Sequence, residues 1–532
     1  MTQSDIKKLE IELWEAADEL RANSKLTASE YKDPLLGLIL LRFAQNKYED
    51  AKEELTKTQP INPRTQKPIE LTKDNFAAVG AMLLPAKAQY EYLAALPESE
   101  NLGEAVNEAM KLIEEEYEEL AGILPKNYQD LTPEDDTDSN LLANLIRIFN
   151  SDSVKKAKGD VFGRIYEYFL MKFSMQGAGA QEGGEFFTPP SLVQLIVNFI
   201  QPNHGIVHDP ACGSGGMFVQ TAHFIKHHHN KSVNQSITVY GTEYKSNTVK
   251  LAKMNLAIHG IEGKIANYNS FYSDPFELVG KCDFVMANPP FNVDKIDAKN
   301  NFLTEDTRLP FGAPLTGKGT IGNGNYLWIQ YFMSYLNATG RAGFVMASSA
   351  TDAGNAEKRI REELVKTGNV ECIVAIGNNF FYTRSLPCHL WFFNKNKKAE
   401  NQDKVLMIDA RNVYRKVSTT INDFSEEHLE GLTAILQLFR GDKAALSQDN
   451  AWFNQHFATG NYQDIEGLCK VVSLADIAEQ DYSLTPGRYV GVNIEIDMNF
   501  DYQARMQELH QELASLHQEA NLLMNQIQAV QL

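Results

Sequence analysis

The stretch that decides the fold reads Asp209-Pro210-Ala211-Cys212-Gly213-Ser214-Gly215-Gly216-Met217-Phe218. It follows a short apolar run at 205–208 and precedes a helical pattern that continues to about Lys226. A strand, a glycine-rich turn and a helix in this order form the βα unit of a nucleotide-binding α/β fold. The acid at the strand end suits an ammonium group better than a pyrophosphate, which binds at a helix N-terminus free of carboxylates. The stretch therefore favours S-adenosylmethionine over a dinucleotide as the cofactor.

A second acid follows the next expected strand. Residues 237–243 are expected to form this strand, and the last of them is Glu243. The end of the second strand is where nucleotide-binding folds hold ribose hydroxyls, so Glu243 is a candidate ribose ligand. A solvent-facing glutamate at a strand end is the alternative.

A stiff turn follows the apolar run 284–287 and reads Asn288-Pro289-Pro290-Phe291. Two prolines cannot continue a strand, so they fix a turn at its carboxyl end, where open α/β sheets bind their ligands. A side-chain amide before the turn and an aromatic ring after it make a slot for a planar amine. Taken alone, the turn is equally compatible with ordinary loop chemistry. Upstream, the segment 184–190 contains an aromatic pair and two prolines that could close one side of a cofactor pocket.

These four motifs occur along the chain in the order 184–190, 209–218, Glu243 and 288–291, and in this order they resemble those of the γ class of DNA amino-methyltransferases. Nearly the whole chain resembles the modification subunit of a type I restriction–modification system. The resemblance implies methyl transfer from S-adenosylmethionine to the N6 amino group of adenine in a specific DNA sequence. The cofactor-binding residues that it implies are Glu185, Phe186, Phe187, Thr188, Asp209, Ala211, Gly213, Ser214, Gly215, Gly216, Glu243 and Asn269. The catalytic residues that it implies are Asn288, Pro289, Pro290 and Phe291.

The chemistry expected at the catalytic turn follows from the weak nucleophilicity of the adenine amino group. Hydrogen bonds to the Asn288 side-chain oxygen and the Pro289 carbonyl would expose the nitrogen lone pair to the sulfonium methyl group. The base must leave the duplex to reach the site, and Phe291 would stack on it. No metal is expected, because the sulfonium leaving group is already activated. Many relatives have an acid near the third strand where this chain has Asn269, which is left as the acceptor for the cofactor's adenine amine.

The chain divides into three expected parts. Residues 1–150 show helical patterns and predict an all-α N-terminal domain, and residues 155–480 predict a Rossmann-like methyltransferase sheet. Strands are expected near 205–209, 236–243, 264–268, 283–287, 342–347, 370–376 and 388–394, with the last one antiparallel. Residues 481–532 predict a tail with a coiled-coil helix. Its apolar residues step by three and four: Met506, Leu509, Leu513, Leu516, Ala520, Leu523, Ile527 and Val530. A helix that folds back on its own domain is the alternative.

Charge and composition bear on the partners. The 532 residues carry a formal net charge of −19, which is unusual for a protein that binds DNA by itself. Either positive charge is local to one cleft, or DNA recognition belongs mainly to a partner. The partners that the resemblance implies are DNA, a specificity subunit and a restriction subunit. The specificity subunit would be bound by the C-terminal helix, with two modification subunits per specificity subunit.

The five cysteines show no zinc spacing and suit the reducing cytoplasm, and no apolar run predicts a membrane span. His227, His228 and His229 are expected to form a solvated surface cluster.

Other functions stay open from the residues alone. A protein glutamine methyltransferase also acts on a planar amide nitrogen, although such enzymes usually have Tyr where Phe291 stands. A non-catalytic DNA-sensing subunit, a dinucleotide-dependent oxidoreductase and a cytosine-N4 methyltransferase are further alternatives. An ATPase is disfavoured, because the P-loop-like stretch 312–319 has Gly319 where a magnesium-binding Ser or Thr is required. The aperiodic stretch 302–325 is expected to help hold the base or the DNA.

Overall fold

The computed structural model describes most of the chain. The described residues are 3–24, 26–79, 81–97, 100–131, 141–157, 159–176, 188–229, 232–381, 386–419, 421–443, 446, 450–457 and 460–491, with short helical pieces between 506 and 524. The chain separates into a larger compact unit, residues 1–490, and a smaller one, residues 491–532.

A nine-stranded sheet lies at the centre of the larger unit, in the order β11-β8-β6-β7-β5-β4-β1-β2-β3. Its strands are β1 (Gly205–Asp209), β2 (Ile237–Glu243), β3 (Gly263–Asn267), β4 (Cys282–Ala287), β5 (Leu336–Ala347), β6 (Val370–Ile376), β7 (Cys388–Asn394), β8 (Lys404–Ala410) and β11 (Cys469–Ser473). A separate ribbon pairs β9 (Arg415–Lys416) with β10 (Asn422–Asp423). All seven predicted strands are present, and β7 runs antiparallel to both β5 and β6, as predicted. The predicted α/β class is confirmed.

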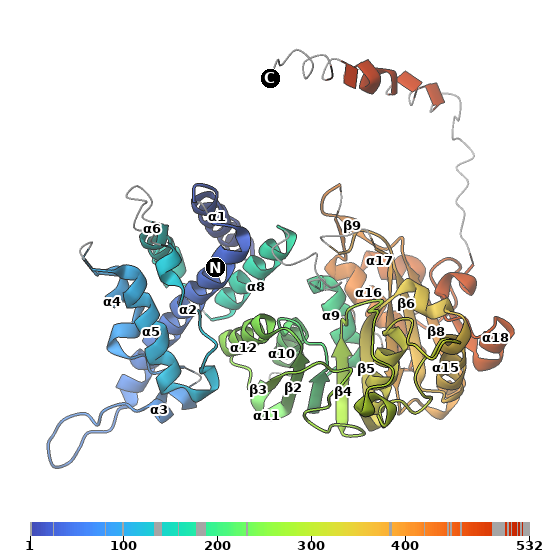
Figure 1. Ribbon diagram of the computed structural model, residues 1–532, viewed down its shortest axis with the longest axis horizontal. Coiled ribbons are helices and arrows are strands. Elements are labelled where there is room, and N and C mark those ends of the chain that lie inside the picture. Colours follow the sequence, from blue (N-terminus) through green and yellow to red (C-terminus); the bar gives the residue numbers. More distant parts are fainter. Residues whose placement is uncertain are drawn as a thin grey trace. The chain divides into compact units, whose positions relative to one another are not determined.

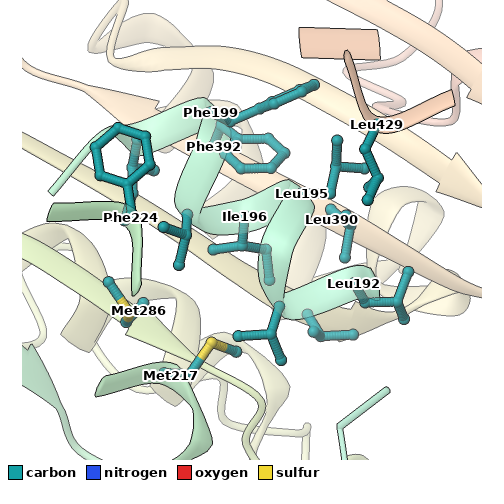
Figure 2. Packing of buried hydrophobic residues seen from close by; sticks show 14 of the residues in the cluster. Leu192, Leu195, Ile196, Phe199, Met217, Phe224, Met286, Leu390, Phe392 and Leu429 are labelled. Carbon is teal, nitrogen blue, oxygen red and sulfur yellow. The ribbon is translucent and has the colours of Figure 1, made fainter. Parts of the chain in front are cut away.

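Helices cover both faces of this sheet (Figure 1). One face packs against α9 (Pro190–Ile200), α10 (Gly216–His229), α12 (Ser246–His259), α16 (Glu426–Phe439) and α17 (Ala451–His456). The other packs against α14 (Asn325–Tyr335), α15 (Asn355–Lys366) and α18 (Leu474–Glu479). The alternation of strand side chains explains the two cores: Phe284 and Met286 enter the first, Val285 and Ala287 the second. Figure 2 shows α9 contributing Leu192, Leu195, Ile196 and Phe199 to the first core.

The N-terminal region is helical, as predicted. Its helices are α1 (Gln3–Ala22), α2 (Ala28–Thr58), α3 (Lys73–Ala78), α4 (Tyr90–Ala94), α5 (Leu102–Glu116), α6 (Leu141–Phe149), α7 (Asp152–Lys155) and α8 (Gly159–Met175). They enclose a core of their own, in which Trp14 packs edge-on against Phe169 and Phe173. Within the described residues, no helix is both long and apolar enough to cross a bilayer.

Helix α12 belongs to two cores at once. Its residues Val249, Ala252 and Leu256 pack in the core under the sheet. Leu251 and Ile258, on its other side, pack among the N-terminal helices. Because two sides of this helix are apolar and packed, α12 joins the helical region to the sheet.

The remaining helical turns are short. They are α11 (Val233–Ser236), α13 (Asn301–Thr304), η1 (Ala86–Ala88), η2 (Glu118–Leu120), η3 (Tyr128–Leu131), η4 (Ser348–Asp352), η5 (Ala399–Asn401) and η6 (Pro486–Arg488). The predicted tail begins at 481, yet Leu484 and Val490 are buried in the second core of the sheet. There the backbone N–H of Leu484 donates to the Thr351 carbonyl of η4. In the smaller unit, Leu513 and Leu516 lie on described helical pieces and are 66% and 56% exposed. The coiled coil stays a prediction, and Leu509, Leu523, Ile527 and Val530 lie outside the described residues.

Candidate active site

The strand order reverses beside β1, and the candidate residues gather there. From β1 the chain adds β2 and then β3 on one side, whereas β4 pairs with β1 on the other side. All four strands are parallel, so their carboxyl ends lie at one edge of the sheet. Ligands of open α/β sheets bind at such a switch point. Asp209 at the end of β1 and Asn288 directly after β4 therefore lie at the same edge of the sheet, beside this switch point.

The turn after β1 has the backbone shape that its glycines predict. Gly213 and Gly215 have φ values of +53° and +80°, which disfavour any other residue. A Cβ atom on Gly213 or Gly216 would meet no atom within 4 Å, so the space above the turn is open. The side chain of Asn255 on α12 donates to the Ser214 carbonyl over 2.9 Å and holds the turn from below.

Two carboxylates stand together beside this turn. Asp209 is 1% exposed and Glu243 is 9% exposed. Glu243 accepts hydrogen bonds from the backbone N–H of Gly213 at 3.1 Å and of Lys245 at 2.8 Å. Burial raises the pKa of Asp209 well above its ordinary value, a hydrogen bond from the Ala211 backbone N–H opposes that rise, and the Glu243 charge adds to it. A buried acid pair beside an open glycine turn fits a cation whose other end carries hydroxyls, as S-adenosylmethionine does.

The turn after β4 fixes its amide and its aromatic ring. The Asn288 amide nitrogen donates to the Thr188 hydroxyl over 2.9 Å. Pro289 is buried, and Phe291 packs edge-on against Phe381 with ring centroids 6.3 Å apart. Both functional groups of the turn are thus positioned by residues far away in the sequence.

Asn325 clamps the same turn and was not among the predicted residues. Its side-chain oxygen accepts from the Asn292 backbone N–H at 2.9 Å, and its amide nitrogen donates to the Asn292 side chain at 2.8 Å. Asn325 is 2% exposed and is the first residue of α14. Asn292 itself has a φ of +53°, a left-handed backbone shape that asparagine adopts more readily than most other residues with a side chain, and the pair secures it. The sequence offers only a weak signal for Asn325, namely its place at the end of the glycine-rich stretch.

The loop after β3 contains Asn269, the predicted acceptor for the cofactor's adenine amine. The Asn269 side-chain oxygen accepts from the Phe271 backbone N–H at 3.0 Å, and Asn269 is half-buried. The neighbouring Ser270 hydroxyl donates to the Pro210 carbonyl at 2.6 Å and joins this loop to the glycine turn. The buried Arg308 donates to the Ser270 carbonyl at 2.8 Å. The stretch after α13 is thereby anchored behind the candidate cofactor site.

Some predicted residues take no described part in this arrangement. Glu185, Phe186 and Phe187 lie outside the described residues. His227 and His228 are exposed, as predicted for a surface cluster. The P-loop-like stretch forms a tight turn in which the Thr316 backbone N–H donates to the Thr320 carbonyl. The five cysteines are buried and form no disulfide.

The comparisons with known proteins decide the family. Residues 157–497 match the N-6 DNA Methylase model, and residues 9–149 match the HsdM N-terminal domain model. The Type I restriction enzyme MjaIX methylase subunit of Methanocaldococcus jannaschii is 35% identical over 98% of this chain and 91% of its own length. The chain belongs to the methylase subunits of type I restriction enzymes. It is an adenine-specific DNA methyltransferase, and S-adenosylmethionine is its cofactor.

Further relatives agree. The HindI methylase subunit of Haemophilus influenzae is 34% identical over 76% of this chain and 86% of its own length. The methyltransferase subunit of a type I restriction–modification system from Streptococcus thermophilus has the same fold, with a TM-score of 0.70 over 91% of this chain and 99% of that chain, at 21% identity.

Proposed function

We propose that the turn Asn288–Phe291 holds an adenine flipped out of DNA, and that a partner subunit chooses which adenine enters. The observation that carries the first part is the meeting of the acid-lined glycine turn and the Asn288 turn at one switch point. Methyl donor and methyl acceptor must lie within reach of each other, and this arrangement supports that.

In this mechanism Asp209 binds the ammonium group of the cofactor and Glu243 its ribose hydroxyls. The open space beside Gly213 and Gly216 lets the cofactor approach the backbone closely, and Gly215 supplies the positive φ that shapes the turn. When bound, S-adenosylmethionine supplies an activated methyl group. No other role is required of it, because the chain's own residues prepare the nucleophile.

Asn288 orients and activates the amino group. Because Thr188 engages the amide nitrogen, we assign the amide oxygen Oδ1 as the acceptor for an adenine N6–H. The Pro289 carbonyl is the proposed second acceptor. Phe291, braced by Phe381, is the proposed stacking surface for the base, a contact worth about 1–3 kcal/mol. Thr188 thus acts as a positioning residue for Asn288.

Methyl transfer by the assembled complex tests these roles. The chain is co-expressed with its specificity subunit, and label from the cofactor is followed into DNA with the modified base identified. Asn288→Ala is expected to abolish N6-methyladenine formation while cofactor binding persists. Asn337→Ala is the matched control, because Asn337 lies at the amino end of β5, at the opposite edge of the sheet from Asn288, and its side chain donates a hydrogen bond to Asp283. An Asn288→Ala enzyme that methylates DNA at the normal rate refutes the assignment.

The C-terminal helix is the proposed contact for the specificity subunit, with two copies of this chain per specificity subunit. The exposure of Leu513 and Leu516 supports a seam that a partner helix covers. The net charge of −19 supports leaving much of the DNA contact to partners, and a restriction subunit completes the complex.

A pull-down tests this seam. The double variant Leu513→Glu, Leu516→Glu is expected to lose the specificity subunit, whereas His517→Glu, an exposed position between seam residues, is expected to keep it. Mass measurement of the assembled complex gives the stoichiometry. Retention of the specificity subunit by the double variant overturns the proposal.

A further inference from the structure

Two histidines and a glutamate converge at a place that methyl transfer does not use. Glu167 comes from α8, His223 from α10 and His259 from the end of α12. One ligand atom of each residue lies within 4.8 Å of the other two, and all three residues are half-buried. The residues come from three separate helices, so the fold and not local sequence brings them together.

The His259 ring is oriented for a lone pair to face this cluster. Its Nδ1 lies 2.8 Å from the Asn255 backbone carbonyl. A carbonyl only accepts, so Nδ1 carries the hydrogen, and a neutral imidazole then has its lone pair on Nε2. Histidine ligands of metals are commonly held in this way, by a hydrogen bond from the other ring nitrogen.

Helix α8 is shaped to admit that nitrogen. A Cβ atom on Gly163 would lie 2.4 Å from His259 Nε2, so only glycine leaves the required space. Four residues further along the helix, Glu167 accepts a hydrogen bond from the Gln220 side chain. Arg164 lies nearby and pairs with Glu10 at 3.0 Å, so that cation already has a carboxylate partner.

We propose that Glu167, His223 and His259 form a binding site for a first-row divalent metal ion, with Zn²⁺ the best match. Two imidazoles and one carboxylate are a known zinc ligand set, with a water in the fourth position. Bonds of about 2.1 Å place the ligand atoms of a tetrahedral zinc about 3.4 Å apart. Small side-chain rotations bring the three residues from their present spacing to that one.

The position of this metal is a bridge between three helices, with its fourth coordination position left to water. Helix α8 packs in the N-terminal core, whereas α10 starts at the glycine turn and α12 follows Glu243. A metal held by all three helices would fasten the N-terminal region to the helices that carry both cofactor-binding turns. Direct hydrogen bonding between Glu167 and a protonated histidine is the competing explanation of the cluster.

Metal titration of the full-length chain separates the two. Protein stripped with a chelator is titrated with Zn²⁺ by calorimetry, and with Co²⁺ by absorption spectroscopy. The expected result is one tight site per chain. The visible absorption bands of bound Co²⁺ should indicate a low-symmetry coordination site, and the thermal midpoint should rise when metal is bound. Glu167→Gln keeps the side-chain shape and is expected to weaken Zn²⁺ binding at least about tenfold. His259→Ala is expected to weaken it further.

His228→Ala is the matched control, because His228 is exposed on the same helix as His223 and belongs to the surface cluster. Its tight site is expected to remain. Weak, multiple or absent binding by the wild-type chain overturns the proposal. Tight binding that Glu167→Gln and His259→Ala leave unchanged, or that His228→Ala removes, also overturns it.

Discussion

Replacing the buried acid Asp209 at the end of β1 is expected to weaken cofactor binding but to stabilise the folded chain. Asp209→Asn preserves shape, and the amide oxygen can still accept the Ala211 backbone N–H that Asp209 accepts at 2.9 Å. The substitution removes the negative charge that the carboxylate presents to the ammonium group of the bound cofactor. A hydrogen bond to a charged group contributes about 1.5–3 kcal/mol, so the affinity for S-adenosylmethionine is expected to fall about 10- to 150-fold.

Stability is expected to move the other way. Burial raises the pKa of Asp209 in the folded chain above the ordinary 3.8. Above pH 3.8 the unfolded chain therefore loses this proton more readily than the folded chain, and ionisation of Asp209 lowers the free energy of unfolding. Asp209→Asn removes that cost. The thermal midpoint of the cofactor-free variant should exceed that of the wild type at pH 7, and the difference should shrink as the pH falls towards 4.

Calorimetric titration with the cofactor and thermal unfolding across this pH range measure both effects. Asp283→Asn is the matched control, because Asp283 lies at the amino end of β4 and accepts the Ile206 backbone N–H at 2.8 Å. Its cofactor affinity should equal that of the wild type. Unchanged affinity in Asp209→Asn, or a lower midpoint at pH 7, would refute the reasoning.

Two more predictions concern the same site and its supports, and a third concerns the ion pair between Glu371 of β6 and Arg440 at the end of α16. Gly213→Ala must adopt a φ of +53°, which costs about 1–2 kcal/mol, so denaturant unfolding should show that loss together with weaker cofactor binding. Asn325→Ala frees the turn that follows Phe291; single-turnover methylation should slow about 100-fold while the cofactor Kd stays constant. Arg440→Met leaves Glu371 buried without the guanidinium that it pairs with at 2.6 Å, and equilibrium unfolding should show a loss of about 3–5 kcal/mol. Because Arg440 holds the pKa of Glu371 below its usual 4.5, this contribution is present above pH 4.5 and disappears as the pH falls through the lower folded value, so wild type and variant should converge in acid.

The sequence predicted the strands that are apolar runs between polar segments. The strand β8 has a run of this kind, Val405–Ile408, so the same rule reaches it although it was not among the predicted strands. By contrast, β11 is an edge strand in which Lys470 is exposed, and its pattern is too weak to read. The order of the strands depends on long-range pairing, and only the antiparallel setting of β7 was predicted.

The candidate site divides in the same way. Its local motifs were readable because a strand end, a glycine turn or a proline pair is defined by neighbours in the chain. The contacts that position them were not, because they join distant residues: Thr188 to Asn288 across 100 positions and Asn325 to Asn292 across 33. A single asparagine or threonine gives no sequence pattern from which its hydrogen-bond partner can be predicted. Long-range polar contacts of this kind can be identified only in the folded structure.

The two-sided packing of α12 bears on how this enzyme can be dissected. An isolated methyltransferase domain that starts after α8 would expose Leu251, Met254 and Ile258 to water. Such a patch favours aggregation. The same helix holds the glycine turn through Asn255, so any shift of α12 after the N-terminal helices are removed would also move the cofactor turn. Anyone who seeks a minimal catalytic fragment should therefore keep the N-terminal helices, or replace these three apolar residues with polar ones before removing them.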